Sequence, residues 1–563
     1  MTGSAASTTG PPGTETGKAR HIVRTVDRKW WTLIAVCTAI FMLLLDITVV
    51  NVALPSIQRS LHSSFSDLQW VVDAYSLTLA AFLLTAGVIG DMFGRREVFA
   101  IGLVVFSLSS LTCGLSTSSL MLNLARAAQG VGGAIMFATS LALIAQAFSG
   151  RERGTAFGIY GAVVGGAVAV GPLVGGAITS GIGWRWIFFV NVPIGALATV
   201  ITLTRVQESR DPAGHRVDWA GFGTFSIALF LLVLALVRGN TDGWRSAEIV
   251  GMLVGAGVLF AAFLVVEAKQ RDPMLDLGLF RRPAMVGVSV AAFAVSASIF
   301  AMFLYLTLYI QDDLGYGPFA AGLRFLPITL LAFLVAPLAG KLTVRFPTRY
   351  LLGLGLLITA VGCALMSTTR PSSAWTVLLP GFVVAGIGVG IINPVLSSAA
   401  ISVVRPERSG MASGANSTFR QVGIATGIAA LGAVFLHQIQ GKVTQVLLAS
   451  PAGRAAAAGR AAALRTAMAS GQVRTLTVTL APAQRHAILS AYRIGFSSTL
   501  DHLLVISALV ALVGAILALA LTRQRDFVAS HAPAPSGPTT SAPESTTGDE
   551  GRWGDPAPAP VVL

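Results

Sequence analysis

Two ionisable residues lie within segments that are otherwise apolar. Asp46 stands in LLLDITVVNVALP (43–55), and Arg126 stands in LNLARAAQGVGGA (122–134). Charged residues inside a bilayer are costly and usually mark an ion path or a substrate path. Desolvation favours the neutral, protonated form of a buried carboxyl group, whereas a nearby arginine favours the carboxylate. The sequence therefore predicts Asp46 and Arg126 as a proton-coupling pair.

Two structural alternatives apply to the same residues. Asp46 could be a permanently neutral or Arg-paired strut, and Arg126 could snorkel toward the membrane interface. Both alternatives, like the proton-coupling hypothesis, require these segments to lie in a membrane.

The composition indicates a membrane protein. Of 563 residues, 54% are hydrophobic and 11% are charged, and the mean hydropathy is +0.74, whereas soluble chains carry charge on about a quarter of their residues. The net charge of +14 lies in short basic clusters between apolar stretches, which indicates positive-inside loops and argues against a nucleic-acid partner.

The sequence carries no sign of an enzyme. No Walker A, His-Glu-x-x-His or Gly-x-Ser-x-Gly sequence occurs, and neither cysteines nor histidines cluster at metal-ligand spacing. We therefore expect no cofactor, no metal ion and no catalytic residue.

Fourteen apolar stretches are long enough to cross ~30 Å of hydrocarbon. Basic residues gather in every second segment between them, including both ends of the chain, so both termini are expected in the cytoplasm and the protein in the plasma membrane. The long segment 438–499 then falls outside, where its Ala- and Arg-rich sequence favours helix. The predicted spans are 31–54, 71–90, 98–116, 120–146, 155–180, 186–205, 219–237, 248–267, 284–310, 321–343, 350–368, 375–398, 411–437 and 500–522.

An internal repeat organises these spans. RGTAFG (153–158) is similar to SGMASG (409–414), and GVIGDMFGRR (87–96) is similar to GKLTVRFPTR (340–349). The alternative is coincidence among Gly- and Ala-rich helices. The repeat predicts an all-α polytopic membrane protein, expected to act as a monomer, in which two six-helix halves flank two inserted helices. The predicted domains are a disordered tail 1–29, an N-terminal half 30–205, inserted helices 206–282, a C-terminal half 283–522 and a disordered tail 523–563.

Residues 30–525 resemble the major facilitator superfamily and, within it, the fourteen-helix drug:proton antiporter branch. GVIGDMFGRR is similar to the family's loop between its second and third helices, with Met92 in place of the usual basic residue. The resemblance implies a cytoplasmic gate, whereas the plainer alternative is a positive-inside turn. The expected gate residues are Gly87, Asp91, Gly94, Arg95 and Arg96.

A second motif points to export. GIYGAVVGGAVAVGPLVGGAI (158–178) resembles the antiporter-specific motif of the fifth helix, with Ala167 where a glycine is usual. The resemblance implies an exporter and not an importer, and the alternative is generic packing of small residues. The matching positions are Gly158, Gly171, Pro172, Gly175 and Gly176.

Candidate substrate contacts are polar residues in apolar surroundings. Asp73 with Tyr75 could hold a lipophilic cation or form a helix start in an interfacial belt. Gln129, Asn393 and Gln421 could contact substrate, although for Asn393, Arg420 and Gln421 helix-to-helix hydrogen bonding is the favoured explanation.

The resemblance as a whole implies a proton-coupled exporter. Its partners would be small amphipathic or cationic drugs or antibiotics, protons and the lipid bilayer. The alternatives are an importer or uniporter of the same superfamily, or a dedicated exporter of one metabolite.

Overall fold

The computed structural model describes most of the chain between the two predicted tails. The described residues are 2–3, 27–62, 65–209, 218–270, 273, 275–343, 345–371, 373–404, 409–460, 463–464, 467–468, 473–478 and 480–523. Within these ranges the secondary structure is helical throughout. The predicted tails fall almost entirely outside the described residues, so their predicted disorder stays a prediction.

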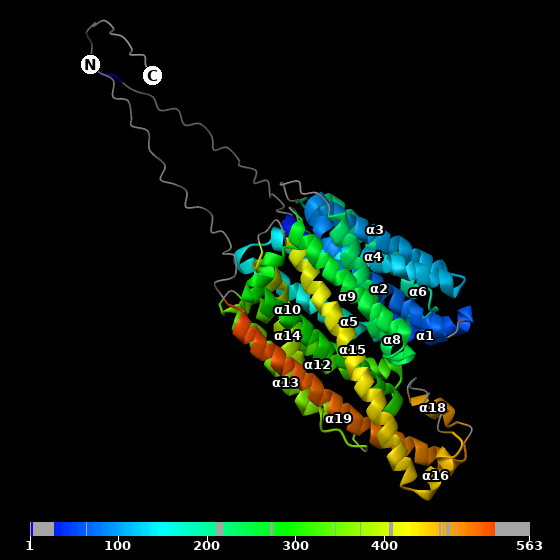
Figure 1. Cartoon of the computed structure of the whole chain (residues 1–563). Coiled ribbons are helices and arrows are strands. Elements are labelled where there is room, and N and C mark those ends of the chain that lie inside the picture. The colour runs from blue at the N-terminus through cyan, green and yellow to red at the C-terminus, as the bar shows by residue number, and fades with distance from the viewer. Residues whose placement is uncertain are drawn as a thin grey trace. The chain divides into compact units, whose positions relative to one another are not determined.

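The N-terminal half supplies the first six spans (Figure 1). Its sixth span is interrupted, because a short helix ends at Phe189 and the next begins at Asn191. Its helices are α1 (Arg28–Leu61), α2 (Phe65–Phe93), α3 (Arg95–Leu115), α4 (Ser119–Ala147), α5 (Gly150–Gly181), α6 (Trp186–Phe189) and α7 (Asn191–Arg205).

Two inserted helices, α8 (Trp219–Asp242) and α9 (Ala247–Lys269), pack against each other. The Asp218 carboxylate caps α8 by accepting a hydrogen bond from the backbone N–H of Gly221 at 2.8 Å. α8 also contacts α2 and α15, whereas α9 exposes large apolar side chains such as Val254 and Val258. This pattern fits a helix whose outer face contacts lipid.

The C-terminal half begins with a helix interrupted twice by π-helical turns, a feature often found at functional sites. A short 3₁₀ turn, η1 (Leu277–Arg281), precedes it. The other elements of this half are α10 (Pro283–Val295), η2 (Ser296–Phe300), α11 (Ala301–Leu308), η3 (Tyr309–Asp313), α12 (Pro318–Leu342), α13 (Thr348–Met366), η4 (Trp375–Leu378), α14 (Leu379–Ser402), α15 (Ser409–Leu448), α16 (Pro451–Ala457), α18 (Val473–Leu476) and α19 (Pro482–Leu521).

The helix lengths confirm the predicted membrane fold. Thirteen helical segments of the described residues are long and apolar enough to cross a membrane, and α5, with 32 residues, is the remaining span. The protein is therefore an all-α, fourteen-span membrane protein. We call the face at which α1 begins and α19 ends the terminal face, and the opposite face the distal face.

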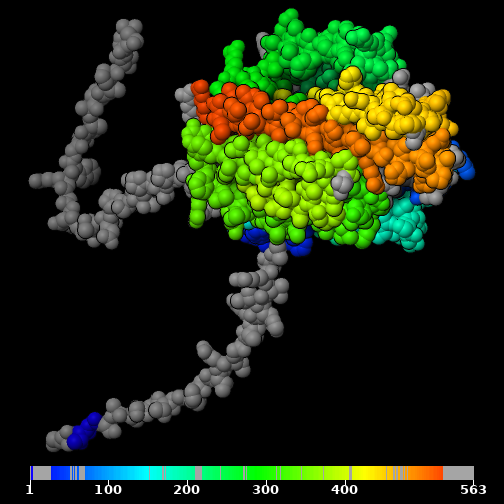
Figure 2. Space-filling model, turned by 90° about the horizontal axis from the view of Figure 1, so that it is seen from below, coloured from blue at the N-terminus to red at the C-terminus, as the bar shows by residue number. Residues whose placement is uncertain are grey.

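Helices α15 and α19 differ from the predicted spans 411–437 and 500–522, because each continues well past them. Each has 40 residues and is about 60 Å long. At the distal end they pack together, and Lys442 Nζ lies 2.8 Å from Ser498 Oγ. α16 and α18 lie at this projecting end in Figure 1, and in Figure 2 the yellow end of α15 lies beside the orange start of α19.

The two halves meet along two similar helix pairs, α2 with α15 and α5 with α12. α2 and α12 carry one pair of repeated segments, and α5 and α15 carry the other. The internal repeat therefore places the same kind of contact twice between the halves.

Candidate functional site

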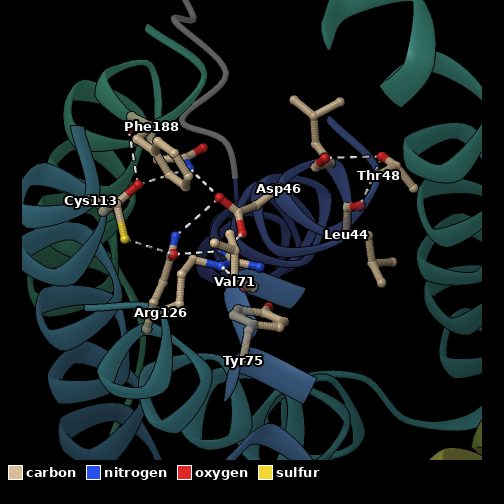
Figure 3. A network of polar contacts seen from close by, with 12 residues as sticks. Leu44, Asp46, Thr48, Val71, Tyr75, Cys113, Arg126 and Phe188 are labelled. Carbon is tan, nitrogen blue, oxygen red and sulfur yellow. Dashed lines mark hydrogen bonds and ion pairs between the residues drawn. The ribbon is translucent and has the colours of Figure 1, made fainter. Parts of the chain in front are cut away.

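Asp46 and Arg126 form a buried ion pair inside the N-terminal half (Figure 3). Arg126 Nη1 lies 2.5 Å from Asp46 Oδ2, and the two residues are 1% and 2% exposed. Arg126 Nη1 also donates to Gln129 Oε1 at 2.8 Å, and its Nε donates to the Val71 carbonyl at 3.0 Å. The guanidinium carbon lies 4.2 Å from the centre of the Tyr75 ring. Nε, Nη1 and the face of the guanidinium are thus held in place.

The second oxygen of Asp46 accepts two further hydrogen bonds. Gln129 Nε2 and Asn191 Nδ2 each lie 3.0 Å from Asp46 Oδ1. Asn191 also donates to Ser110 Oγ at 3.1 Å, and that hydroxyl donates to the Phe188 carbonyl at 2.9 Å. The network therefore joins side chains of α1, α3, α4 and α7.

Local structure explains why these groups converge. Arg126 and Gln129 are three residues apart on α4 and so lie on the same helix face. Asn191 is the first residue of α7, placed there by the break after α6. α1, which carries Asp46, contacts both α4 and α7.

The contacts of Asp46 also define its chemistry in this conformation. Arg126, Gln129 and Asn191 all present N–H donors to the carboxylate, and donation from Arg126 to Gln129 Oε1 fixes the orientation of that amide. Oδ1 accepts hydrogen bonds from both Gln129 and Asn191, so a proton on that oxygen would displace one of them. Binding a proton at Oδ1 therefore requires the network to rearrange.

Asn191 was not predicted as a site residue. Its signal in the sequence was one amide in the apolar segment WRWIFFVNVPIG (184–195), the same kind of signal that singled out Asn393. The break between α6 and α7, which aims Asn191 at Asp46, is not visible in the sequence.

Asp91 links the two halves at the terminal face. Its Oδ1 accepts a hydrogen bond from the backbone N–H of Gly410, and its Oδ2 accepts one from Met411, both at 2.9 Å. These N–H groups belong to the first turn of α15, where helix donors lack partners and the helix dipole is positive. Arg95 Nε and Nη2 each lie 2.8 Å from Asp91 Oδ1. An acid of one half thus caps a helix of the other.

The next residues of the same motif fix the start of α3. Gly94 has φ +115°, and a Cβ there would lie 2.8 Å from the Glu208 carboxyl carbon. The backbone N–H of Arg96 donates to Glu208 Oε1 at 3.0 Å, and its guanidinium lies 3.6 Å from the same carboxylate. Gly94 and Arg96 therefore hold the α2–α3 turn against the segment after α7, a contact that the sequence did not predict.

We call the contacts α2–α15 and α5–α12 between the halves the two seams. Glycine pairs allow close contact along both seams at the terminal face. A Cβ on Gly87 would overlap the Gly410 carbonyl oxygen, and one on Gly410 would overlap that of Gly87. Gly154 and Gly340 have the same relationship. Because the obstacle in each case is backbone, a side chain could not be accommodated by moving a rotamer.

The separation of the halves increases along α5 away from the terminal face. A Cβ on Gly158 would lie 2.7 Å from Pro337 Cα, whereas one on Gly165 would lie 3.8 Å from Ala332 Cβ. The closest approach between α5 and α12 is therefore at the terminal face.

The distal part of α5 contacts α1 instead of α12. A Cβ on Gly171 would overlap Thr48, and one on Gly175 would lie 3.0 Å from Val49 Cα. A Cβ on Gly176 would meet no atom within 4 Å. Pro172 lies in the same helix. Two of the motif glycines thus bring α5 against the turn of α1 that follows Asp46.

Asp73 and Tyr75 do not form a joint site, because residues two apart point to different sides of a helix. The Tyr75 ring lies beneath Arg126 in the network, and its buried hydroxyl has no hydrogen-bond partner among the described residues. Asp73 is half-buried and lies within Coulomb range of Arg238 on α8.

The remaining predicted contacts lie in the C-terminal half. Asn393 is buried in α14, and its Oδ1 has no partner within the described ranges. Gln421 is half-buried in α15. No group of three or more His, Cys, Asp or Glu side chains in the described part of the chain is placed to hold a metal ion.

Residues 36–428 match a family model described as Major Facilitator Superfamily. "Multidrug resistance protein Stp" of Mycobacterium tuberculosis is 38% identical over 404 residues, which cover 72% of this chain and 75% of that protein. "Puromycin resistance protein pur8" of Streptomyces alboniger is 37% identical and covers 72% of this chain and 82% of that protein. "Tetracenomycin C resistance and export protein" of Streptomyces glaucescens is 33% identical over 73% and 77% of the two chains.

Solved structures share the fold at low sequence identity. The human organic anion transporter MFSD10 aligns with a TM-score of 0.56 at 14% identity, covering 86% of this chain and 99% of that one. The proton:xylose symporter XylE aligns with the same TM-score and identity, covering 88% and 96%.

Proposed function

Because the chain belongs to the Major Facilitator Superfamily, we propose that it exports drugs or antibiotics in exchange for protons by alternating access. The observation that carries this proposal is the buried Asp46–Arg126 pair with its two amide donors. Three relatives with 33–38% identity are named for resistance to drugs or antibiotics, one of them also for export. No chemical change of the cargo is part of the proposal.

The terminal face is assigned to the cytoplasm. Basic residues gather in the segments that join helices at this face, as expected for positive-inside loops. The protein then lies in the plasma membrane with both termini inside, and α16 and α18 lie outside. The domain boundaries predicted from the sequence and a monomeric state belong to the same proposal.

The conformation described here is closed toward the cytoplasm. The glycine contacts of both seams and the Asp91 cap on α15 lie at the terminal face, whereas α5 and α12 separate away from it. Opening to the cytoplasm requires the Asp91 hydrogen bonds to break. The cap and the seams together are the gate of the transporter.

Proton binding shifts the equilibrium between the conformation closed toward the cytoplasm and the one open toward it. A proton from outside reaches Asp46, displaces hydrogen bonds from Arg126, Gln129 or Asn191 and loosens the hold of α4 and α7 on α1. Thr48, two residues after Asp46 on α1, lies against Gly171 of α5, and α5 packs against α12. Rearrangement at Asp46 thereby biases the gate, and re-forming the network releases the proton inward.

The alternative role for Asp46 is a fixed Arg-paired strut, and a transport assay separates the two. In proteoliposomes with an imposed pH gradient, uptake of the anion 8-anilinonaphthalene-1-sulfonate and of the cation ethidium is followed for wild type, Asp46→Asn and Asp46→Glu. We expect Asp46→Asn to lose gradient-driven transport while retaining substrate binding, and Asp46→Glu to keep part of the activity. Full gradient-driven transport by Asp46→Asn would return Asp46 to a structural role. Transport that runs only down the substrate's own gradient would favour a uniporter.

A further inference from the structure

Arg420 is a cation in the interior of α15 without an acidic partner among the described residues. Within the described part of the chain, the titratable group in its Coulomb range is the phenol of Tyr160. Its guanidinium carbon lies 5.5 Å from the centre of the Phe300 ring. Arginine within a membrane span is costly and normally pairs with an acid, as Arg126 does with Asp46.

The position of Arg420 is central in two senses. Tyr160 belongs to α5 of the N-terminal half and Phe300 to η2 of the C-terminal half, so the guanidinium lies where the halves face each other. It also lies almost three turns of α15 beyond Gly410, or about 15 Å from the Asp91 cap. This depth is near the middle of ~30 Å of hydrocarbon. Substrate sites of transporters built from repeats lie at this depth, between the halves.

The surroundings of Arg420 have unused hydrogen-bonding capacity. Asn416 lies one turn earlier on the same helix face, and its buried Oδ1 has no partner in the described part of the chain. Arg420 itself is half-buried. A buried polar atom without a partner costs free energy, so this cluster is better satisfied when a polar ligand is present.

The acids of the N-terminal half cannot balance this charge. Asp46 is already paired with Arg126. Asp73 lies within Coulomb range of Arg238 on α8. The centre between the halves is therefore electropositive, which disfavours the cationic cargo expected from the sequence.

We propose that Arg420 recognises an acidic oxygen group of the cargo, with Phe300 flanking the aromatic or apolar body to which that group is attached. The inference rests on the proposed export function, because it assigns the substrate class of that same site. A guanidinium binds a carboxylate or sulfonate through charge-assisted hydrogen bonds. Transported compounds would thus be amphipathic anions.

Equilibrium binding tests the inference without requiring transport. Full-length protein in nanodiscs of zwitterionic lipid is titrated with the anionic dye 8-anilinonaphthalene-1-sulfonate and with the cationic dye rhodamine 6G. Arg420→Gln is expected to weaken binding of the anionic dye at least about tenfold and to leave or strengthen binding of the cation. Arg420→Lys keeps the charge and should retain part of the affinity. Arg370→Gln, which removes the same charge from an exposed distal loop, is the matched control.

A second measurement uses the wild-type protein alone, so it does not depend on how a variant folds. Naphthalene-2-carboxylate should displace the bound anionic dye at least about tenfold more effectively than its methyl ester, because only the acid pairs with Arg420. Equal displacement by acid and ester, equal weakening of both dyes by Arg420→Gln, or saturable binding of the cation alone would overturn the inference. A protein that binds anions at Arg420 but does not move them against a gradient would instead contradict the proposed export function.

Discussion

Asp91 and Gly410 come from opposite halves of the chain, yet the Asp91 carboxylate accepts a hydrogen bond from the Gly410 backbone at 2.9 Å. The related seam between α5 and α12 has the same glycine contact, but in the repeated segment the residue aligned with Asp91 is Val344. One of two similar seams therefore carries a charged cap. We infer that breaking the Asp91 cap controls opening at the terminal face.

Asp91→Asn should shift the protein toward the state open at the terminal face. The substitution removes the negative charge that pairs with Arg95 and with the N–H groups of α15, and each charge-assisted hydrogen bond contributes about 1.5–3 kcal/mol. A shift of about tenfold or more in the two-state equilibrium follows. A cysteine introduced at position 411, now buried, should react faster with an impermeant maleimide in inside-out vesicles, while transport slows.

The control for this experiment is Glu97→Gln, an exposed acid close to the same turn. It removes one negative charge without touching the start of α15, so labelling and transport should match wild type. If Asp91→Asn inserts normally and its labelling and transport are unchanged, the Asp91 cap has no role in gating.

Asn191→Ala should weaken the coupling of transport to protons. It removes a donor to Asp46 Oδ1 and leaves Ser110 without that partner. We expect gradient-driven transport in proteoliposomes to fall about tenfold, the loss associated with one hydrogen bond to a charged group. Thr204→Ala, an exposed position on the same helix, serves as the control. Wild-type proton release on substrate addition by Asn191→Ala would show that Arg126 and Gln129 suffice.

Gly171→Ala should separate α1 from α5. The new methyl group would overlap Thr48, whose hydroxyl already donates to the Leu45 carbonyl at 2.9 Å. Overpacking of this kind costs about 1–3 kcal/mol, so transport should fall several-fold while the protein still inserts. Gly223→Ala on α8 meets no atom within 4 Å and should behave as wild type. Equal activity of the two variants would show that α1 and α5 need not stay in contact.

Epitope tags test the assigned orientation. Tags at residue 10 or 540 should be reached by antibody only after the membrane is permeabilised, and a tag near residue 460 should be reached on intact cells or spheroplasts. The opposite labelling would contradict the assignment of the terminal face to the cytoplasm.

The sequence predicted the fold because the hydropathy of each span is set by its own residues, and because the internal repeat can be recognised from two pairs of short segments. It also identified Asp46, Arg126 and Asp91, since a charge in an apolar segment is visible without a structure. It did not find Asn191 as a partner of Asp46, because the break between α6 and α7 sets the direction of that amide.

Charge pairing across helices was the other missing information. The sequence left Asp73 open between a cation site and a helix start, because it does not show that Arg238, on an inserted helix, lies within Coulomb range. It left Arg420 open between helix packing and substrate contact, because the charges around that residue emerge only after folding. The predicted spans 411–437 and 500–522 cover only part of α15 and α19, because each helix continues without a break into the segment 438–499, where the sequence favours helix.

α15 is one unbroken helix that joins two remote parts of the molecule. Its first turn carries the Asp91 cap, and its last turns lie beside α16, outside the membrane in the orientation proposed here. A tilt of about 5° around the middle of a rod about 60 Å long moves each end by about 2.6 Å, enough to break a hydrogen bond. An antibody fragment that binds the outer end of α15 would therefore stabilise or weaken the gate at the opposite face, while remaining outside the cell.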